Sequence, residues 1–152
     1  MAISALTAIS SPNSFTDFAA EQDTLTFTYN GLEIAPHAEA APVIEALGEP
    51  KSYTEETSCA FEGLDKTYYY GSFYLATYPM EGKDYVYTLW FADDTVTTAE
   101  GIRIGSPQSQ VEEAYGADSF NGSNSYVVTK GKCRLVILIE GETVSGVRYE
   151  AI

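Results

Sequence analysis

Two spacings of apolar positions alternate along the 152-residue chain. An i, i+3, i+4 spacing predicts one short helix that ends at Leu47-Gly48 and another that ends at Tyr115-Gly116. Elsewhere apolar and polar residues alternate, with many Tyr, Phe, Thr and Val, which predicts antiparallel strands. The predicted strands are 24–29, 66–70, 73–78, 85–91, 125–129, 133–139 and 143–149.

A short motif precedes each predicted helix. Its first copy is Leu32-Glu33-Ile34-Ala35-Pro36, and its second copy is Ile102-Arg103-Ile104-Gly105-Ser106-Pro107. Each copy predicts a short strand followed by a proline suited to the first helical position, and each helix then ends at a glycine. Ser106 is placed to cap the second helix, whereas Pro42 requires the first helix to begin again there.

The distance between the two motifs, about 70 residues, predicts an internal repeat. The expected fold class is therefore α+β, a tandem duplication of a unit made of a strand, a helix and a three-stranded antiparallel meander. We expect one domain over 24–152, built from repeats 24–95 and 96–152, with 96–98 as a strand of the second repeat. Residues 1–23 are rich in Ala, Ser and Thr and are expected to form a flexible N-terminal segment.

The Ile-x-Ile-Gly-Ser-Pro motif with its following meander resembles the tandem units of beta-lactamase inhibitory protein and of small barrel-assembly lipoproteins. This resemblance implies their fold, although beta-lactamase inhibitory protein has a disulfide in each unit and this chain has one cysteine per unit. Four further segments resemble a family of lipoproteins from gut Firmicutes and imply an extracytoplasmic protein, lipid-anchored at the cell surface through a cysteine upstream of residue 1. These segments are 58–66, 77–79, 98–102 and 144–149.

The charge of the chain limits the classes of partner that it can bind. It has 22 acidic and 8 basic residues, a formal net charge of −14. Phosphates would repel such a surface, which argues against nucleic acids and anionic membranes. No apolar run approaches the roughly 20 residues that a transmembrane helix needs, so no transmembrane segment is expected.

Residues that could carry chemistry are few. His37 is the only histidine, and it is expected at the exposed start of the first helix. Cys59 and Cys133 could form a disulfide or remain separate thiols, and the acidic neighbours of Cys59 disfavour a reactive thiolate there. The pattern favours a protein with no catalytic residues, no metal site and no cofactor.

Aromatic residues concentrate in the strands of the first half. Alternation places Tyr68 and Tyr70 on one face of the sheet, and it places Tyr85 and Tyr87 on the face opposite Trp90. One set is expected in the core, and the other could pack beneath the N-terminal segment or offer a platform to a protein or a sugar. The candidate binding residues are Tyr68, Tyr70, Tyr74, Tyr85 and Tyr87.

The sequence therefore favours a non-enzymatic extracytoplasmic binding module, a cell-surface lipoprotein domain that recognises a protein partner. Two alternatives remain. One is a carbohydrate-binding or carbohydrate-active protein that uses tyrosines and acidic residues. The other is an inhibitor of a secreted enzyme such as a beta-lactamase.

Overall fold

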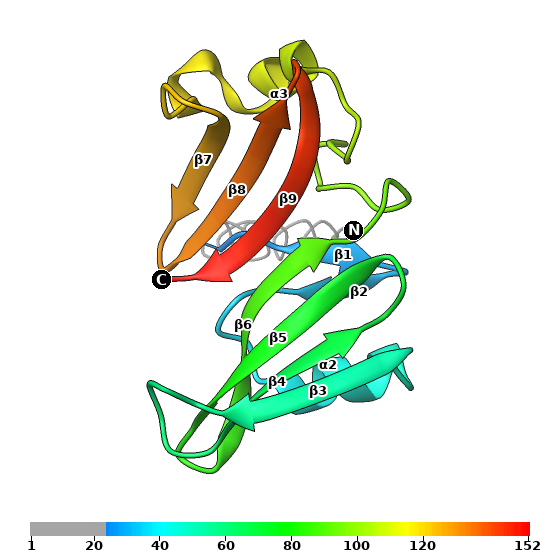
Figure 1. Ribbon diagram of the computed structural model, residues 1–152, viewed down its shortest axis with the longest axis vertical. Coiled ribbons are helices and arrows are strands. Elements are labelled where there is room, and N and C mark those ends of the chain that lie inside the picture. The colour runs from blue at the N-terminus through cyan, green and yellow to red at the C-terminus, as the bar shows by residue number, and fades with distance from the viewer. Residues whose placement is uncertain (1–23) are drawn as a thin grey trace, which may run out of the picture.

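A computed structural model describes residues 24–152 of the chain. Its main feature is a seven-stranded antiparallel sheet with the strand order β3-β4-β5-β6-β9-β8-β7 (Figure 1). A separate hairpin, β1-β2, and two helices accompany this sheet. The expected flexible segment 1–23 lies outside the described residues. The elements are β1 (Phe27–Tyr29), β2 (Leu32–Ile34), α2 (Ala40–Leu47), β3 (Ser52–Thr57), β4 (Leu64–Tyr69), β5 (Phe73–Met80), β6 (Lys83–Phe91), α3 (Gln108–Tyr115), η2 (Ala117–Ser119), β7 (Ser125–Lys130), β8 (Cys133–Glu140) and β9 (Thr143–Ala151).

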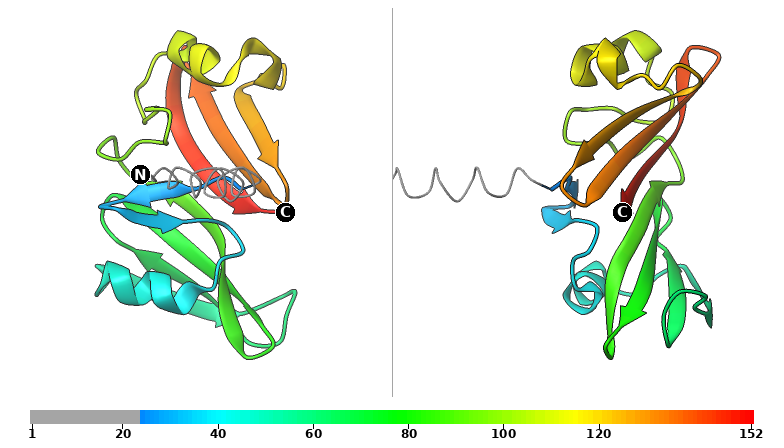
Figure 2. Two further views of the ribbon diagram at one scale, coloured as in Figure 1. Left: turned by 180° about the vertical axis from the view of Figure 1, so that it is seen from behind. Right: turned by 90° about the vertical axis from the view of Figure 1, so that its left-hand side faces the viewer.

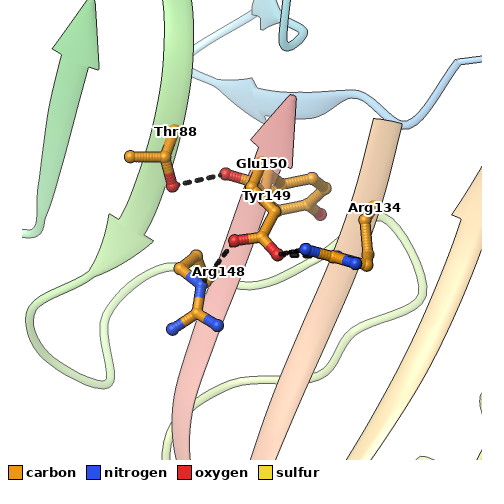
Figure 3. Close-up of polar contacts among 5 residues, drawn as sticks. All are labelled: Thr88, Arg134, Arg148, Tyr149 and Glu150. Carbon is orange, nitrogen blue, oxygen red and sulfur yellow. Dashed lines mark hydrogen bonds and ion pairs between the residues drawn. The ribbon is translucent and has the colours of Figure 1, made fainter. Parts of the chain in front are cut away.

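The sheet is built from two meanders that meet at β6 and β9. Strands β3 to β6 form the first meander and β7 to β9 the second. The junction has three register pairs, Thr88 with Glu150, Leu89 with Tyr149 and Trp90 with Arg148. In addition, the Thr88 hydroxyl donates a hydrogen bond of 2.8 Å to the Tyr149 carbonyl (Figure 3). This short pairing makes one continuous sheet from segments that are distant in sequence.

Within the described part of the chain, one side of the sheet is covered and the other is open. The β1-β2 hairpin and both helices lie on the same side, as the side view in Figure 2 shows. We call this side the inner face and the opposite side, toward the viewer in Figure 1, the outer face. The core lies on the inner face, because alternate residues of each strand are buried there. Its largest fully buried side chains are Tyr126, Phe27, Phe73, Ile34, Leu75, Leu89, Ile102, Leu135 and Ile137.

The two helices end as their sequences predict. Gly48 and Gly116 follow the helices with φ of 83° and 91°, a conformation in which glycine is not strained. Their amides donate to the carbonyls of Ile44 and Glu112, which closes the last turn of each helix. Among residues 24–152, no helix has the length and apolar character that crossing a bilayer requires.

The expected fold class, α+β with a tandem duplication, is wrong. The described chain is mainly β, with two α-helices of eight residues each. The first meander has four strands and the second has three. Residues 96–98 and 102–104 form no strand, so no second hairpin matches β1-β2. The two halves are therefore not copies of a strand, helix and three-stranded meander unit.

Three local predictions also need correction. Strand β3 was not expected, because its sequence, Ser-Tyr-Thr-Glu-Glu-Thr, has no apolar alternation and all six residues are exposed at the sheet edge. Ser106 does not cap α3. The N-cap is Pro107, and the Ser106 hydroxyl accepts a hydrogen bond from the Arg103 amide instead. Pro42 lies within the first turn of α2, where a missing amide hydrogen costs no intrahelical bond.

Candidate binding face

Three aromatic side chains form a row across the outer face. Tyr69 of β4 is in register with Tyr74 of β5, which is in register with Trp90 of β6. Their rings stack, with centroids 4.6 Å apart for Tyr69 and Tyr74 and 4.9 Å apart for Tyr74 and Trp90. We call this row the aromatic ladder. Because each ring supports the next, the side chains have fixed orientations before any ligand arrives.

A second aromatic group, the aromatic patch, lies further along β5 and β6 on the same face. Tyr78 is its centre. It stacks on Phe61 at 5.3 Å and on Tyr85 at 5.7 Å, and it meets the edge of Tyr87 at 6.3 Å. Phe61 and Tyr87 are among the most exposed large hydrophobic residues, at 42% and 51%. Exposed aromatic groups that touch one another are typical of recognition surfaces.

A β-bulge explains why Tyr85 and Trp90 lie on the same face. In the register of β5 with β6, Ala76 pairs with Thr88 and Thr77 pairs with Val86, which leaves Tyr87 without a partner. An extra residue reverses the alternation on one side of the bulge and turns its own side chain outward. The prediction that Tyr85 and Trp90 occupy opposite faces is therefore wrong.

His37 fixes the aromatic patch to the second meander. Its Nε2 lies 3.1 Å from the Lys132 carbonyl, and because a carbonyl only accepts, Nε2 is the protonated nitrogen. In the neutral ring Nδ1 then accepts from the Tyr78 hydroxyl at 2.9 Å. Both ring nitrogens thus hold the structure together, which is a different role from the exposed helix-start position expected for this residue.

Beside the ladder, two arginines share one carboxylate (Figure 3). Arg134 contacts Glu150 Oε2 through both Nε and Nη2, each at 2.7 Å. Arg148 donates to Glu150 Oε1 through Nε at 2.9 Å. Glu150 is only 16% exposed, whereas both arginines are 41% exposed. The group carries a net charge of +1 on a chain whose net charge is −14.

The candidate tyrosines do not share a single face. Tyr74, Tyr85 and Tyr87 belong to the outer face, as described above. Tyr68 and Tyr70 share one face, as alternation predicts, but it is the inner face, where both pack against the core. Burial raises the pKa of Tyr70 to about 12, and its hydroxyl is buried without a hydrogen-bond partner among residues 24–152. These two tyrosines contribute to packing, so the five candidates divide into three surface residues and two that support the core.

Other members of the outer face were not among the predicted site residues. Tyr69 and Trp90 belong to the same aromatic run as the candidates, and their register alone would have revealed the ladder. Phe61 lies in a loop, and Arg148 lies in the other meander, 58 positions after Trp90 in sequence but paired with it in space. Only the order of the strands could bring Arg148 into this face.

The two cysteines are not joined in the structure. Cys59 is an exposed free thiol in the loop after β3, and Cys133 is a buried free thiol at the start of β8. The Cys133 thiol lies 3.8 Å from the Pro36 carbonyl. The possible disulfide between them is therefore not formed. Within residues 24–152, no group of three His, Cys, Asp or Glu side chains is placed to hold a metal ion.

Comparison with known proteins gives a distant structural similarity and no family assignment. It matches no protein-family model and no curated protein. It is similar to the crystal structure of an extracellular protein containing an SCP domain from Bacillus anthracis strain Ames, with 15% sequence identity and a TM-score of 0.45. The match covers 76% of this chain and 44% of that one. The chain thus corresponds to less than half the length of the protein it matches.

Proposed function

We propose that this chain is a non-enzymatic extracytoplasmic binding module that recognises a protein partner with the outer face of its sheet. The main support for the proposal is that a stacked aromatic ladder lies beside an arginine on a sheet face that no element of residues 24–152 covers. The extracytoplasmic setting has its support in the resemblance of four segments to the lipoprotein family of gut Firmicutes.

The chemistry of the outer face suits a protein interface. Trp, Tyr and Arg are the residues that most often dominate the binding energy between proteins. Here Trp90 of β6 lies between Tyr74 of β5 and Arg148 of β9 on adjacent strands of the sheet, and the aromatic patch lies beside them. Because the ladder is already stacked, its own side chains would lose little conformational freedom when a partner binds. Both features favour recognition of another protein.

The stacking of the ladder argues against a carbohydrate platform. A sugar binds by lying flat against an open aromatic ring. Tyr74 has Tyr69 on one side and Trp90 on the other, with interplanar angles of 29° and 9°. Since neighbouring side chains cover both faces of Tyr74, it presents mainly its edge and its hydroxyl to solvent. Ring edges and hydroxyl groups are better suited to the mixed apolar and polar surface of a protein.

The proposal can be tested by measuring which proteins the chain captures from a mixture. The full chain, wild type and two variants, would be incubated with the secreted and surface proteins of the organism that produces it. Tyr87→Ser and Phe61→Ser remove exposed aromatic side chains of the patch without emptying the core. We expect a protein that the wild type retains to bind at least about tenfold more weakly to either variant.

Tyr53→Ser is the matched control, because Tyr53 is 42% exposed but lies on the opposite face, at the edge strand β3. It should retain the partner as well as the wild type does. A partner that all variants retain equally would place recognition elsewhere on the molecule. If the wild type retains no protein from these fractions, recognition of a protein partner is itself contradicted.

A further inference from the structure

A cleft opens in the outer face where β6 and β9 diverge. The two strands pair from Thr88 to Trp90, and beyond this point the first residues of β9 have no pairing with β6. The space between them has a volume of about 420 Å³, enough for one or two side chains. Its lining residues are Thr88, Trp90, Phe91, Leu138, Ser145, Gly146, Val147 and Arg148.

The guanidinium of Arg148 has unused donors at the rim of this cleft. Its contact with Glu150 uses Nε alone, at 2.9 Å. No other described residue forms a hydrogen bond or ion pair with its two terminal nitrogens, and Figure 3 shows them directed away from Glu150. Two parallel N–H groups of this kind match the two oxygens of a carboxylate. Because Glu150 holds Nε, the group is oriented before a ligand binds.

The charge of this cleft differs from that of its neighbours. Of the described residues that line it, Arg148 alone is charged. The four other clefts described on residues 24–152 each include at least one Asp or Glu among their lining residues. On a chain with 22 acidic residues, a cleft that contains an arginine and no carboxylate is complementary to a negative group.

We propose that the cleft between β6 and β9 binds an Asp or Glu side chain of the protein partner, flanked by apolar residues. The terminal nitrogens of Arg148 would receive the carboxylate, and Trp90 with Leu138 would contact the apolar neighbours. A strongly acidic partner surface is excluded, because the net charge of −14 would repel it. The inference depends on the proposed function only in assigning the ligand to a protein.

The experiment uses two blocked peptides, acetyl-Leu-Glu-Leu-amide and acetyl-Leu-Gln-Leu-amide. Trp90 is the only tryptophan of the chain, so its fluorescence reports on this cleft directly. We expect the glutamate peptide to change the emission with a dissociation constant of about 1 mM. The glutamine peptide keeps the shape but loses the charge, and it should bind about tenfold more weakly.

Three variants test whether Arg148 is responsible for the preference for the glutamate peptide. Arg148→Gln should abolish the preference for glutamate. Arg148→Lys retains the charge but not the two parallel donors, so it should keep at most a small part of the preference. Arg103→Gln changes the net charge equally but alters an exposed arginine that does not line the cleft, and it should behave as the wild type. The emission without peptide and the urea midpoint verify that each variant is folded.

Several results would overturn the inference. These are equal binding of both peptides, an unchanged preference in Arg148→Gln, or no response to the glutamate peptide up to about 10 mM. Such a result leaves the protein-binding proposal intact if capture still depends on Phe61 and Tyr87. Conversely, Arg148-dependent peptide binding without any captured partner would support the carboxylate site and contradict the proposed function.

Discussion

Both faces of the seven-stranded sheet carry aromatic residues, which form part of the core on the inner face and an exposed surface on the outer face. The inner face buries Phe73 and Leu75 beneath α2 and the β1-β2 hairpin. The outer face holds Tyr74 and Trp90 in a stack that no other element of residues 24–152 covers. Since neighbouring residues of one strand point to opposite faces, one aromatic-rich sequence supplies both a core and a surface. The contrast indicates that aromatic content beyond the needs of the core is available for recognition.

The largest difference between the faces should appear when a phenylalanine is truncated. Phe73 is 0% exposed and contacts Phe27 and Tyr29 in the core. We expect Phe73→Ala to lower the free energy of unfolding by about 3–5 kcal/mol, because it leaves a cavity. Phe61→Ala on the outer face should cost less than about 1 kcal/mol. Urea denaturation measures both, and equal losses would contradict the assignment of the faces.

The ladder should contribute a smaller amount to stability. Tyr74→Leu removes both stacking contacts of the central ring, and we expect a loss of about 1–2 kcal/mol. The emission of Trp90 should also change, because its stacking partner is gone. Tyr87→Leu is the control, since Tyr87 contacts Tyr78 only at a ring edge, and it should leave the stability nearly unchanged. A Trp90 emission that is the same in both variants would show that the ladder is not formed.

A substitution at the junction between the meanders should lower the free energy of unfolding by a smaller amount still. Thr88→Val preserves the shape of the side chain but removes the hydrogen bond to the Tyr149 carbonyl. We expect a loss of about 1 kcal/mol in the free energy of unfolding. Thr54→Val, on the exposed edge strand β3, provides the comparison and should change it by less than about 0.5 kcal/mol. If both substitutions have the same effect, this bond does not stabilise the junction.

The smallest effect at neutral pH is expected for Tyr70→Phe on the inner face. The Tyr70 hydroxyl has no hydrogen-bond partner in the described part of the chain, so its removal should be nearly neutral or slightly stabilising. Burial raises the pKa of Tyr70 from 10.0 to about 12. Because the folded state holds this proton more tightly than the unfolded state does, the difference in pKa contributes to folding stability. This contribution is complete below pH 10 and is lost as the pH rises from 10 to 12.

Tyr70→Phe should therefore lose less stability than the wild type between pH 9 and about pH 11. Unfolding experiments at these two pH values make the comparison, with Tyr69→Phe on the outer face as the control. Identical alkaline losses in the wild type and in Tyr70→Phe would show that this hydroxyl is not desolvated in the folded protein.

Local sequence signals predicted much of the secondary structure. The alternating apolar residues of β5, β6, β8 and β9 predicted these strands to within a few residues. The glycines after α2 and α3 marked the helix ends, because a left-handed residue there is nearly always glycine. Strand β3 escaped prediction, since an exposed edge strand has no buried face and therefore no alternation.

The prediction of an internal repeat was wrong for a related reason. The motifs around Ile34 and Ile104 are alike in sequence, and each precedes a helix. Residues 32–34 become a strand because they pair with Phe27–Tyr29, whereas 102–104 have no such partner and remain a loop. A three-residue strand depends on its neighbour more than on its own sequence.

The sequence by itself determined the position of most strands, the concentration of tyrosines in the first half of the chain and the large negative charge. The tertiary structure decided which aromatic residues face solvent, through the bulge at Tyr87, and which residue completes the face, through the pairing of β6 with β9. The physical reason is that alternation and composition are local properties. Register and strand order depend on hydrogen bonds between segments far apart in the chain.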